Sequence, residues 1–241
     1  MSSNLSALTT FNVTDPRDVA AYSIPEAAHY LGVPASTLRS WFAGQKYSHK
    51  GEQRSFHAVI RAADPKTLGL SFSNLVEAYV LTAIRRKHHV GLPTIRRGLK
   101  YLTEKLGSKR PLLEEQFATR GAELFVERLG RIINLSRNGQ LEMAELIRAY
   151  LERVERDAKG VPIKLYPFMR SQPPHEQPRS VVIYPRVSFG RPVVAGTGIP
   201  TAVLAEQFKA GDAVPELAKE YGASEEAVWD AIRCELDLKA A

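Results

Sequence analysis

Residues 22–42 read YSIPEAAHYLGVPASTLRSWF and carry the strongest structural signal in the chain. Ser23 can cap a helix that Pro25 opens in its first turn. Gly32 breaks this helix, and a second helix follows through Leu38 and the two aromatic residues after Ser40. Two short helices joined by a glycine-containing turn predict a helix-turn-helix.

The second helix of this pair offers polar side chains to a nucleic acid. In a helix-turn-helix, the N-terminal residues of the second helix face base edges in the major groove. The exposed hydrogen-bonding positions here are Ser36, Thr37, Arg39 and Ser40. Arginine can pair with guanine or with phosphate, and hydroxyl groups can serve either. A helical hairpin with a polar outer face is the alternative, and we favour DNA binding.

Two further groups of residues extend the expected DNA surface. The stretch from Gln45 to Leu70 contains turn signals and alternating apolar positions, which favour a small β-hairpin. The residues on this hairpin that would form a wing beside the reading helix are Lys46, Tyr47, Lys50 and Arg54. The basic stretch between residues 85 and 110 adds Arg85, Arg86, Arg96 and Arg97. Contact with several phosphates would make binding sensitive to salt. A basic surface that docks an acidic protein is the alternative.

Composition supports a cytoplasmic protein with a nucleic-acid partner. The 241 residues carry a net charge of +7, with +8 on residues 1–120 and −1 on the remainder. Such an uneven positive charge is expected for phosphate contact. The single Cys234 excludes an intramolecular disulfide, and no signal peptide or long apolar run indicates export or a membrane.

Catalytic and metal-binding patterns are missing from the sequence. The six histidines form no HExxH arrangement, and there is no CxxC motif, nucleophile elbow or P-loop. The acidic clusters alternate with arginines, as on a solvated helix face. We therefore expect no catalytic residues, no metal and no cofactor, and a protein that is not an enzyme.

The rest of the chain predicts further helices and a second small domain. Helices are expected at 72–88, 94–106 and 143–157, with a hairpin at 123–135 that turns near Gly130. Prolines crowd residues 158–180, which is typical of an interdomain linker. Two short strands and three helices then follow, at 181–184, 192–195, 201–209, 214–221 and 224–236. The last two helices form a second helix-turn-helix pattern, and the sequence leaves open which of the two contacts DNA.

Two stretches resemble known families. Residues 22–39 resemble the first helix-turn-helix of MerR-type regulators, which implies a winged helix with Arg39 and the wing near Arg54 on DNA. The dimerisation coiled coil and effector domain usual in that family are not visible. Residues 184–201 resemble the domain-of-unknown-function-433 (DUF433) family, whose usual pattern is GxPxxxGTRIP before a trihelical unit. The arginine of that pattern is replaced here by Gly198.

The combination of these domains with the middle of the chain is similar to VapB-type antitoxins. The stretches that carry this resemblance begin at Asn74 and Leu124. It implies an antitoxin that neutralises a PIN-like ribonuclease toxin and represses the pair's own promoter by binding double-stranded DNA. A homodimer is expected, because helix-turn-helix proteins read two half-sites through two-fold symmetry. The alternatives are a stand-alone MerR-like transcriptional regulator and, from another class, a nucleic-acid enzyme such as a recombinase.

These observations predict an α+β, mostly α, fold with a winged helix-turn-helix N-terminal domain and a C-terminal trihelical domain with short strands. The expected organisation is a flexible arm over 1–20, a MerR-like winged helix-turn-helix with a helical and hairpin extension over 21–157, a Pro-rich linker over 158–180 and a DUF433-like domain over 181–241.

Overall fold

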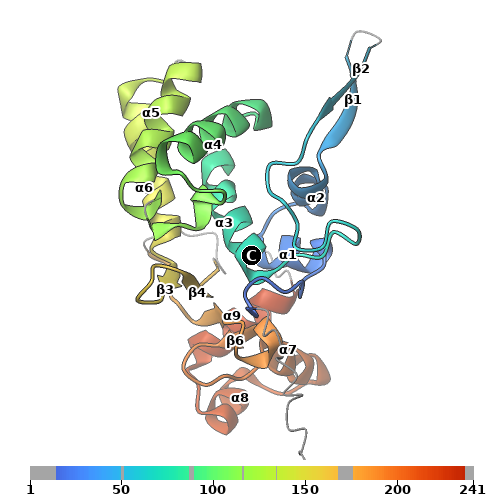
Figure 1. Cartoon of the computed structure of the whole chain (residues 1–241). Coiled ribbons are helices and arrows are strands. Elements are labelled where there is room, and N and C mark those ends of the chain that lie inside the picture. Colours follow the sequence, from blue (N-terminus) through green and yellow to red (C-terminus); the bar gives the residue numbers. More distant parts are fainter. Residues whose placement is uncertain are drawn as a thin grey trace, which may run out of the picture.

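The computed structural model of this chain describes residues 15–49, 52–86, 90–115, 117–133, 135–167 and 176–236. A helix pair with a projecting hairpin lies beside a group of helices, and a small sheet leads into a C-terminal helical unit (Figure 1). The predicted fold class, mostly helical with short strands, is confirmed. No helix in the described ranges is long and apolar enough to cross a membrane.

The N-terminal unit is the predicted helix-turn-helix with a wing. Helix α1 (Ile24–Leu31) starts in a capping box between Ser23 and Glu26, and α2 (Ala35–Ala43) follows. Between them Gly32 adopts the left-handed conformation, with φ of 61°. Strands β1 (Gln45–His49) and β2 (Glu52–Phe56) then pair antiparallel and project away from α2 (Figure 1).

Four longer helices form the middle of the molecule. Helix α3 (Phe72–Arg86) is buried along nearly its whole length and lies between α1 and α6. Around it lie α4 (Leu92–Leu106), α5 (Ala122–Ile133) and α6 (Arg137–Leu151). Two short helical turns, 111–113 and 117–121, connect α4 to α5.

The hairpin predicted at residues 123–135 is wrong, because this segment is helix α5. Its buried residues Phe125, Val126 and Leu129 follow helical spacing. Gly130 is not a turn: a Cβ at this position would lie 2.5 Å from the Gln140 side chain of α6. The glycine therefore allows two helices to approach closely, which the local sequence does not reveal.

The helix predicted at residues 143–157 is shifted in the structure. Helix α6 begins at Arg137 and ends at Leu151, and residues 154–156 form a strand instead. The strand is explained by tertiary pairing with residues 162–165, which outweighs local helical periodicity.

A four-stranded antiparallel sheet joins the middle of the chain to its C-terminal unit. Its order is β3 (Val154–Arg156), β4 (Pro162–Leu165), β5 (Val181–Ile183) and β6 (Pro192–Val194). Strand β4 lies within the stretch predicted to be a linker. The buried Arg153 side chain donates hydrogen bonds to four main-chain carbonyls of this stretch, those of Tyr166, Pro167, Gln177 and Pro178. The described parts of the stretch are thus tied to the sheet, and the domain boundaries stay a prediction.

The C-terminal unit is trihelical and has a core of its own. Helices α7 (Thr201–Ala210), α8 (Val214–Tyr221) and α9 (Glu225–Leu236) enclose buried Leu204 and Val228. The turn between α8 and α9 again uses a left-handed glycine. This turn gives the second helix-turn-helix pattern predicted from the sequence.

Candidate nucleic-acid interface

The first turns of α2 line an open groove of about 710 Å³. Four predicted DNA contacts on this helix border the groove: Ser36, Thr37, Arg39 and Ser40. Its opposite wall comes from the end of α3 and the start of α4, and none of the described residues that line it is acidic. The groove therefore combines hydroxyl and guanidinium donors without a carboxylate to compete for them, which suits a phosphate or a base edge.

Arg85 is the sequence-predicted residue that reaches this groove from another helix. Its guanidinium lies 5.9 Å from the ring centroid of buried Trp41, so the aromatic ring holds the cation in place. Burial lowers the pKa of Arg85, but arginine remains charged at neutral pH. The fold thus places a fixed positive charge beside the exposed face of α2.

The side chains of Ser40 and Arg39 on α2 differ in whether another group of the protein bonds them. The Ser40 hydroxyl donates to the Thr37 carbonyl at 2.7 Å, so its proton serves the helix. Arg39 is exposed, and no ion pair with another described residue holds its side chain. Arg39 is therefore the residue of α2 best able to reach an external partner.

The two arginines predicted on α4 separate in the structure. Arg97 is exposed and lies 3.3 Å from the Thr94 hydroxyl, near the start of the helix. Arg96 is half-buried, donates to the His57 carbonyl and lines a different cleft. The structure therefore brings Arg85 to the α2 groove and directs Arg96 elsewhere.

The remaining predicted contacts lie on the wing and at the end of α3. Lys46 and Tyr47 belong to β1, and Arg54 belongs to β2 directly opposite Tyr47. Arg86 is the last residue of α3. Lys50 lies outside the described residues.

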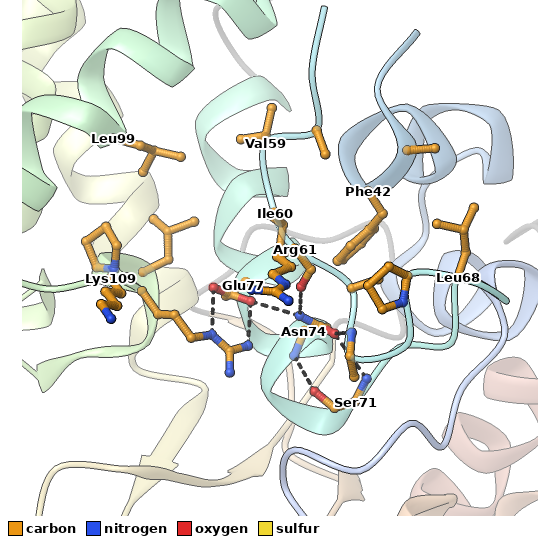
Figure 2. Close-up of a pocket in the computed structure, with 18 of the residues that line it drawn as sticks. Phe42, Val59, Ile60, Arg61, Leu68, Ser71, Asn74, Glu77, Leu99 and Lys109 are labelled. Carbon is orange, nitrogen blue, oxygen red and sulfur yellow. Dashed lines mark hydrogen bonds and ion pairs between the residues drawn. The ribbon is translucent and has the colours of Figure 1, made fainter.

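A buried polar network supports the helix-turn-helix and was missed as a site by the sequence reasoning. The Asn74 side chain accepts from the Ala63 amide at 2.8 Å and donates to the Arg61 carbonyl at 2.9 Å (Figure 2). It also donates to Glu77, which accepts two hydrogen bonds from Arg110. This network anchors the segment after the wing to α3. The sequence feature that could have revealed it is the pair Asn74 and Glu77, two polar residues three positions apart on an otherwise apolar helix.

Helix α1 is also held by the C-terminal part of the chain. The Tyr22 hydroxyl donates to the Gly190 carbonyl at 2.8 Å, and Arg191 forms an ion pair with Glu26 at 2.5 Å. Burial alone would raise the pKa of Glu26, but hydrogen bonds from Ser23 and the charge of Arg191 hold that pKa below its usual value. The first residues of the DUF433-like pattern thus position the N-terminal helix pair.

The second helix-turn-helix offers a different surface. The exposed first residues of α9 are Glu225 and Glu226, where α2 has Ala35 and Ser36. Two carboxylates at this position repel phosphate. Of the two helix pairs, the first has the charge that a nucleic acid requires.

The described residues also bear on two other kinds of site, a metal site and a reactive cysteine. No group of three His, Cys, Asp or Glu side chains among them could hold a metal ion. Cys234 is buried, and this burial raises the pKa of its thiol well above the usual range. A buried thiol that stays protonated is a poor nucleophile.

The comparisons with known proteins cover both ends of the chain and most of its length. Residues 20–99 match the family model "Putative DNA-binding HTH domain", and residues 181–233 match "Protein of unknown function (DUF433)". "Putative antitoxin VapB45" of Mycobacterium tuberculosis is 30% identical over 233 residues, covering 89% of this chain and 93% of that protein.

Two more proteins of Mycobacterium tuberculosis are similar to this chain. "Uncharacterized protein Rv2308" is 24% identical over 231 residues, which cover 92% of each chain. The crystal structure of Rv2018 superposes with a TM-score of 0.65 at 24% identity, covering 89% of this chain and 98% of that one. This likeness shows a shared fold.

Proposed function

This chain belongs to the same family as the Mycobacterium tuberculosis protein "Putative antitoxin VapB45", and from that premise we propose that it is the DNA-binding antitoxin of a toxin–antitoxin pair. It binds double-stranded DNA of its own promoter, and so represses the pair, and it neutralises a PIN-like ribonuclease toxin. It acts in the cytoplasm, where its DNA is, and it is not an enzyme.

The observation that carries DNA binding is the acid-free groove along α2. Ser36, Thr37 and Arg39 line it, and Arg85 is held at its edge by Trp41. A second helix with exposed donors at its start matches the way helix-turn-helix proteins enter the major groove. The match of residues 20–99 to a DNA-binding family model supports the same role.

The proposed DNA surface has a centre and a periphery. The central contacts come from α2 and the end of α3: Ser36, Thr37, Arg39, Ser40 and Arg85. The wing supplies phosphate contacts beside them through Lys46, Tyr47, Lys50 and Arg54, and the flanking basic residues are Arg86, Arg96 and Arg97. Two copies of the chain read two half-sites, so the DNA-bound form is a homodimer.

The toxin half of the proposal is tested by co-expression with the product of the neighbouring gene. We expect a stable complex, and we expect RNA cleavage by the partner alone but not by the complex. A catalytically inactive partner variant serves as the control for contaminating nucleases. A partner that binds but cleaves no RNA contradicts the ribonuclease assignment, and no complex contradicts the antitoxin assignment.

The DNA half is tested separately by fluorescence anisotropy with the chain's own upstream DNA. We expect binding that weakens steeply between 50 and 200 mM salt, as it does when several phosphates are neutralised. Tight DNA binding without any toxin complex would favour the alternative, a stand-alone MerR-like transcriptional regulator. The helix-turn-helix and its wing are the features that favour this second candidate.

A further inference from the structure

A second, larger cleft of about 1340 Å³ lies between the helix-turn-helix and α4. Phe42, Val59, Leu68 and Leu99 contribute apolar surface to it, and Figure 2 shows Leu99 on one side and Phe42 and Leu68 on the other. Such a partly apolar surface is unlike the hydroxyl-lined groove beside α2 and suits a protein surface better than a phosphate backbone. Among the predicted DNA contacts whose side chains the structure describes, Arg96 alone lines this cleft.

The cleft is rimmed by more positive charge than the described carboxylates neutralise. Its two acidic lining residues, Asp18 and Glu77, are both bonded to Arg110. Within the described ranges, no carboxylate forms an ion pair with Arg61 or Lys109, and Lys100 has Glu104 at 4.0 Å. The apolar floor and the excess of cations together call for an acidic partner with an apolar residue at its centre.

The chain's own terminal and linker segments do not meet this description. Residues 1–14 and 168–175 contain no aspartate or glutamate, and residues 237–241 contain one acidic and one basic residue. These segments are therefore not the acidic occupant, whereas a folded part of a second copy of this chain can be its source.

The C-terminal helices offer such a surface. Residues 201–236 contain eight acidic and three basic residues, although the whole chain is basic. Glu216 and Glu220 are exposed one turn apart on α8, and Glu225 is exposed at the start of α9. Trp229, one turn further along α9, is 36% exposed. We refer to these four residues as the acidic ridge.

We propose that the cleft of one copy binds the acidic ridge of a second copy, so that two reciprocal contacts form the homodimer. Opposite charges surround an apolar contact on both sides, which is how complementary interfaces are arranged. Two identical contacts related by a two-fold axis close the assembly at two chains. This inference rests on the homodimer in the proposed function and names its surface.

Sedimentation velocity on the full chain with paired charge reversals tests this arrangement. The cleft variant is Lys100→Glu with Lys109→Glu, and the ridge variant is Glu220→Lys with Glu225→Lys. Each variant alone should raise the dimer dissociation constant by roughly tenfold or more, because like charges then meet in both contacts. An equimolar mixture of the two variants should recover dimers, because each of its two contacts again pairs opposite charges.

A matched control reverses two exposed lysines outside the cleft, Lys159→Glu and Lys209→Glu, and should leave the dimer unchanged. Circular dichroism and thermal melting establish that each variant is folded. A monomeric wild type overturns both the homodimer and its surface. A dimer that ignores the reversals, or a mixture that stays monomeric, overturns the surface but leaves the homodimer and the antitoxin role standing. A cleft variant that stays dimeric but loses the toxin overturns the inference by assigning the cleft to the toxin.

Discussion

The two helix pairs of this molecule, α1–α2 and α8–α9, share a plan and differ in surface. Each first helix has a proline in its first turn, and each turn has a left-handed glycine, with φ of 61° at Gly32 and 62° at Gly222. The fourth residue of each second helix, Leu38 or Val228, is fully buried. Local signals of the same kind therefore produce the same motif twice.

The difference lies in the charge at the start of the second helix. Helix α2 begins with Ala35 and two hydroxyl residues beside an acid-free groove, whereas α9 begins with two exposed glutamates. The motif is a scaffold, and the residues on it decide whether it can approach DNA. The comparison predicts one nucleic-acid surface and one acidic surface on the same backbone plan.

The largest expected effects on stability come from the buried fourth residue of the second helix in each pair, Leu38 in α2 and Val228 in α9. Leu38→Ala should reduce the free energy of unfolding by about 2–5 kcal/mol, because it leaves a cavity in the main core. Val228→Ala should cost less, about 1–2 kcal/mol, because it removes two methyl groups from the smaller C-terminal core. Urea denaturation followed by circular dichroism measures both. Equal losses for the two variants would contradict the smaller cost expected in the C-terminal core.

The next effect separates the two helix pairs by function, at the fifth residue of each second helix. Arg39→Ala should weaken binding to the upstream DNA by about tenfold to a hundredfold, since it removes a direct contact. Trp229→Ala, the matching change on α9, should leave DNA affinity within about twofold when DNA binding is measured at saturating dimer concentration. Fluorescence anisotropy at fixed salt gives both affinities. An equal loss of DNA affinity in Trp229→Ala and Arg39→Ala would contradict the assignment of DNA binding to the first helix pair.

Substituting the turn glycine of each helix pair should have a smaller effect on stability, and it tests whether the two turns are built alike. Gly32→Ala and Gly222→Ala should each cost about 1–2 kcal/mol, because an L-residue is strained at positive φ. No heavy atom lies within 4 Å of a Cβ built at either glycine, so steric clashes add nothing and the two costs should be equal. Thermal melting compares them, with Gly91→Ala, at a negative φ, as the control. Clearly unequal losses would argue that the two turns are held differently.

The smallest effect concerns the contact that joins the first helix pair to the sheet. Because the pKa of Glu26 lies below its usual value, its charge stabilises the fold above about pH 4.3. That contribution disappears as pH falls through the lowered pKa. The pair is half-exposed, so the loss between pH 6 and pH 3 should be about 0.5–1 kcal/mol.

Glu26→Gln is the matched control for this pH dependence. Glutamine keeps the capping-box hydrogen bonds but carries no charge. The variant should therefore lack the 0.5–1 kcal/mol component of acid sensitivity that wild type shows. Identical pH dependence of unfolding in the two proteins would remove the role assigned to the Glu26–Arg191 pair.

The sequence predicted the features that depend on local signals. The helix cap at Ser23, the turn at Gly32 and the trihelical C-terminal unit all follow from residues close together in the chain. The hairpin predicted at 123–135 failed because the role of Gly130 depends on a side chain from α6. Local patterns do not report such contacts between distant segments.

Prediction of the candidate DNA-binding site from the sequence was limited in the same way. The sequence identified the basic residues around α2 and α4 but could not separate Arg85, which lines the α2 groove, from Arg96, which lines the other cleft. It also gave no role to Asn74 and Glu77, because Asn74 bonds the backbone at Arg61 and Ala63 and Glu77 bonds Arg110, more than thirty residues away. Which face a charge occupies is decided by packing between helices.

The central claim is that the first helix pair contacts DNA and the second does not. Site-specific photo-crosslinking tests it most directly, with a benzophenone side chain placed at the first residue of α2, Ala35, or of α9, Glu225. We predict a crosslink to the upstream DNA from position 35 and none from position 225, even though the second substitution also removes a negative charge. Crosslinking from position 225 but not from position 35 would contradict the account and assign DNA binding to the C-terminal unit.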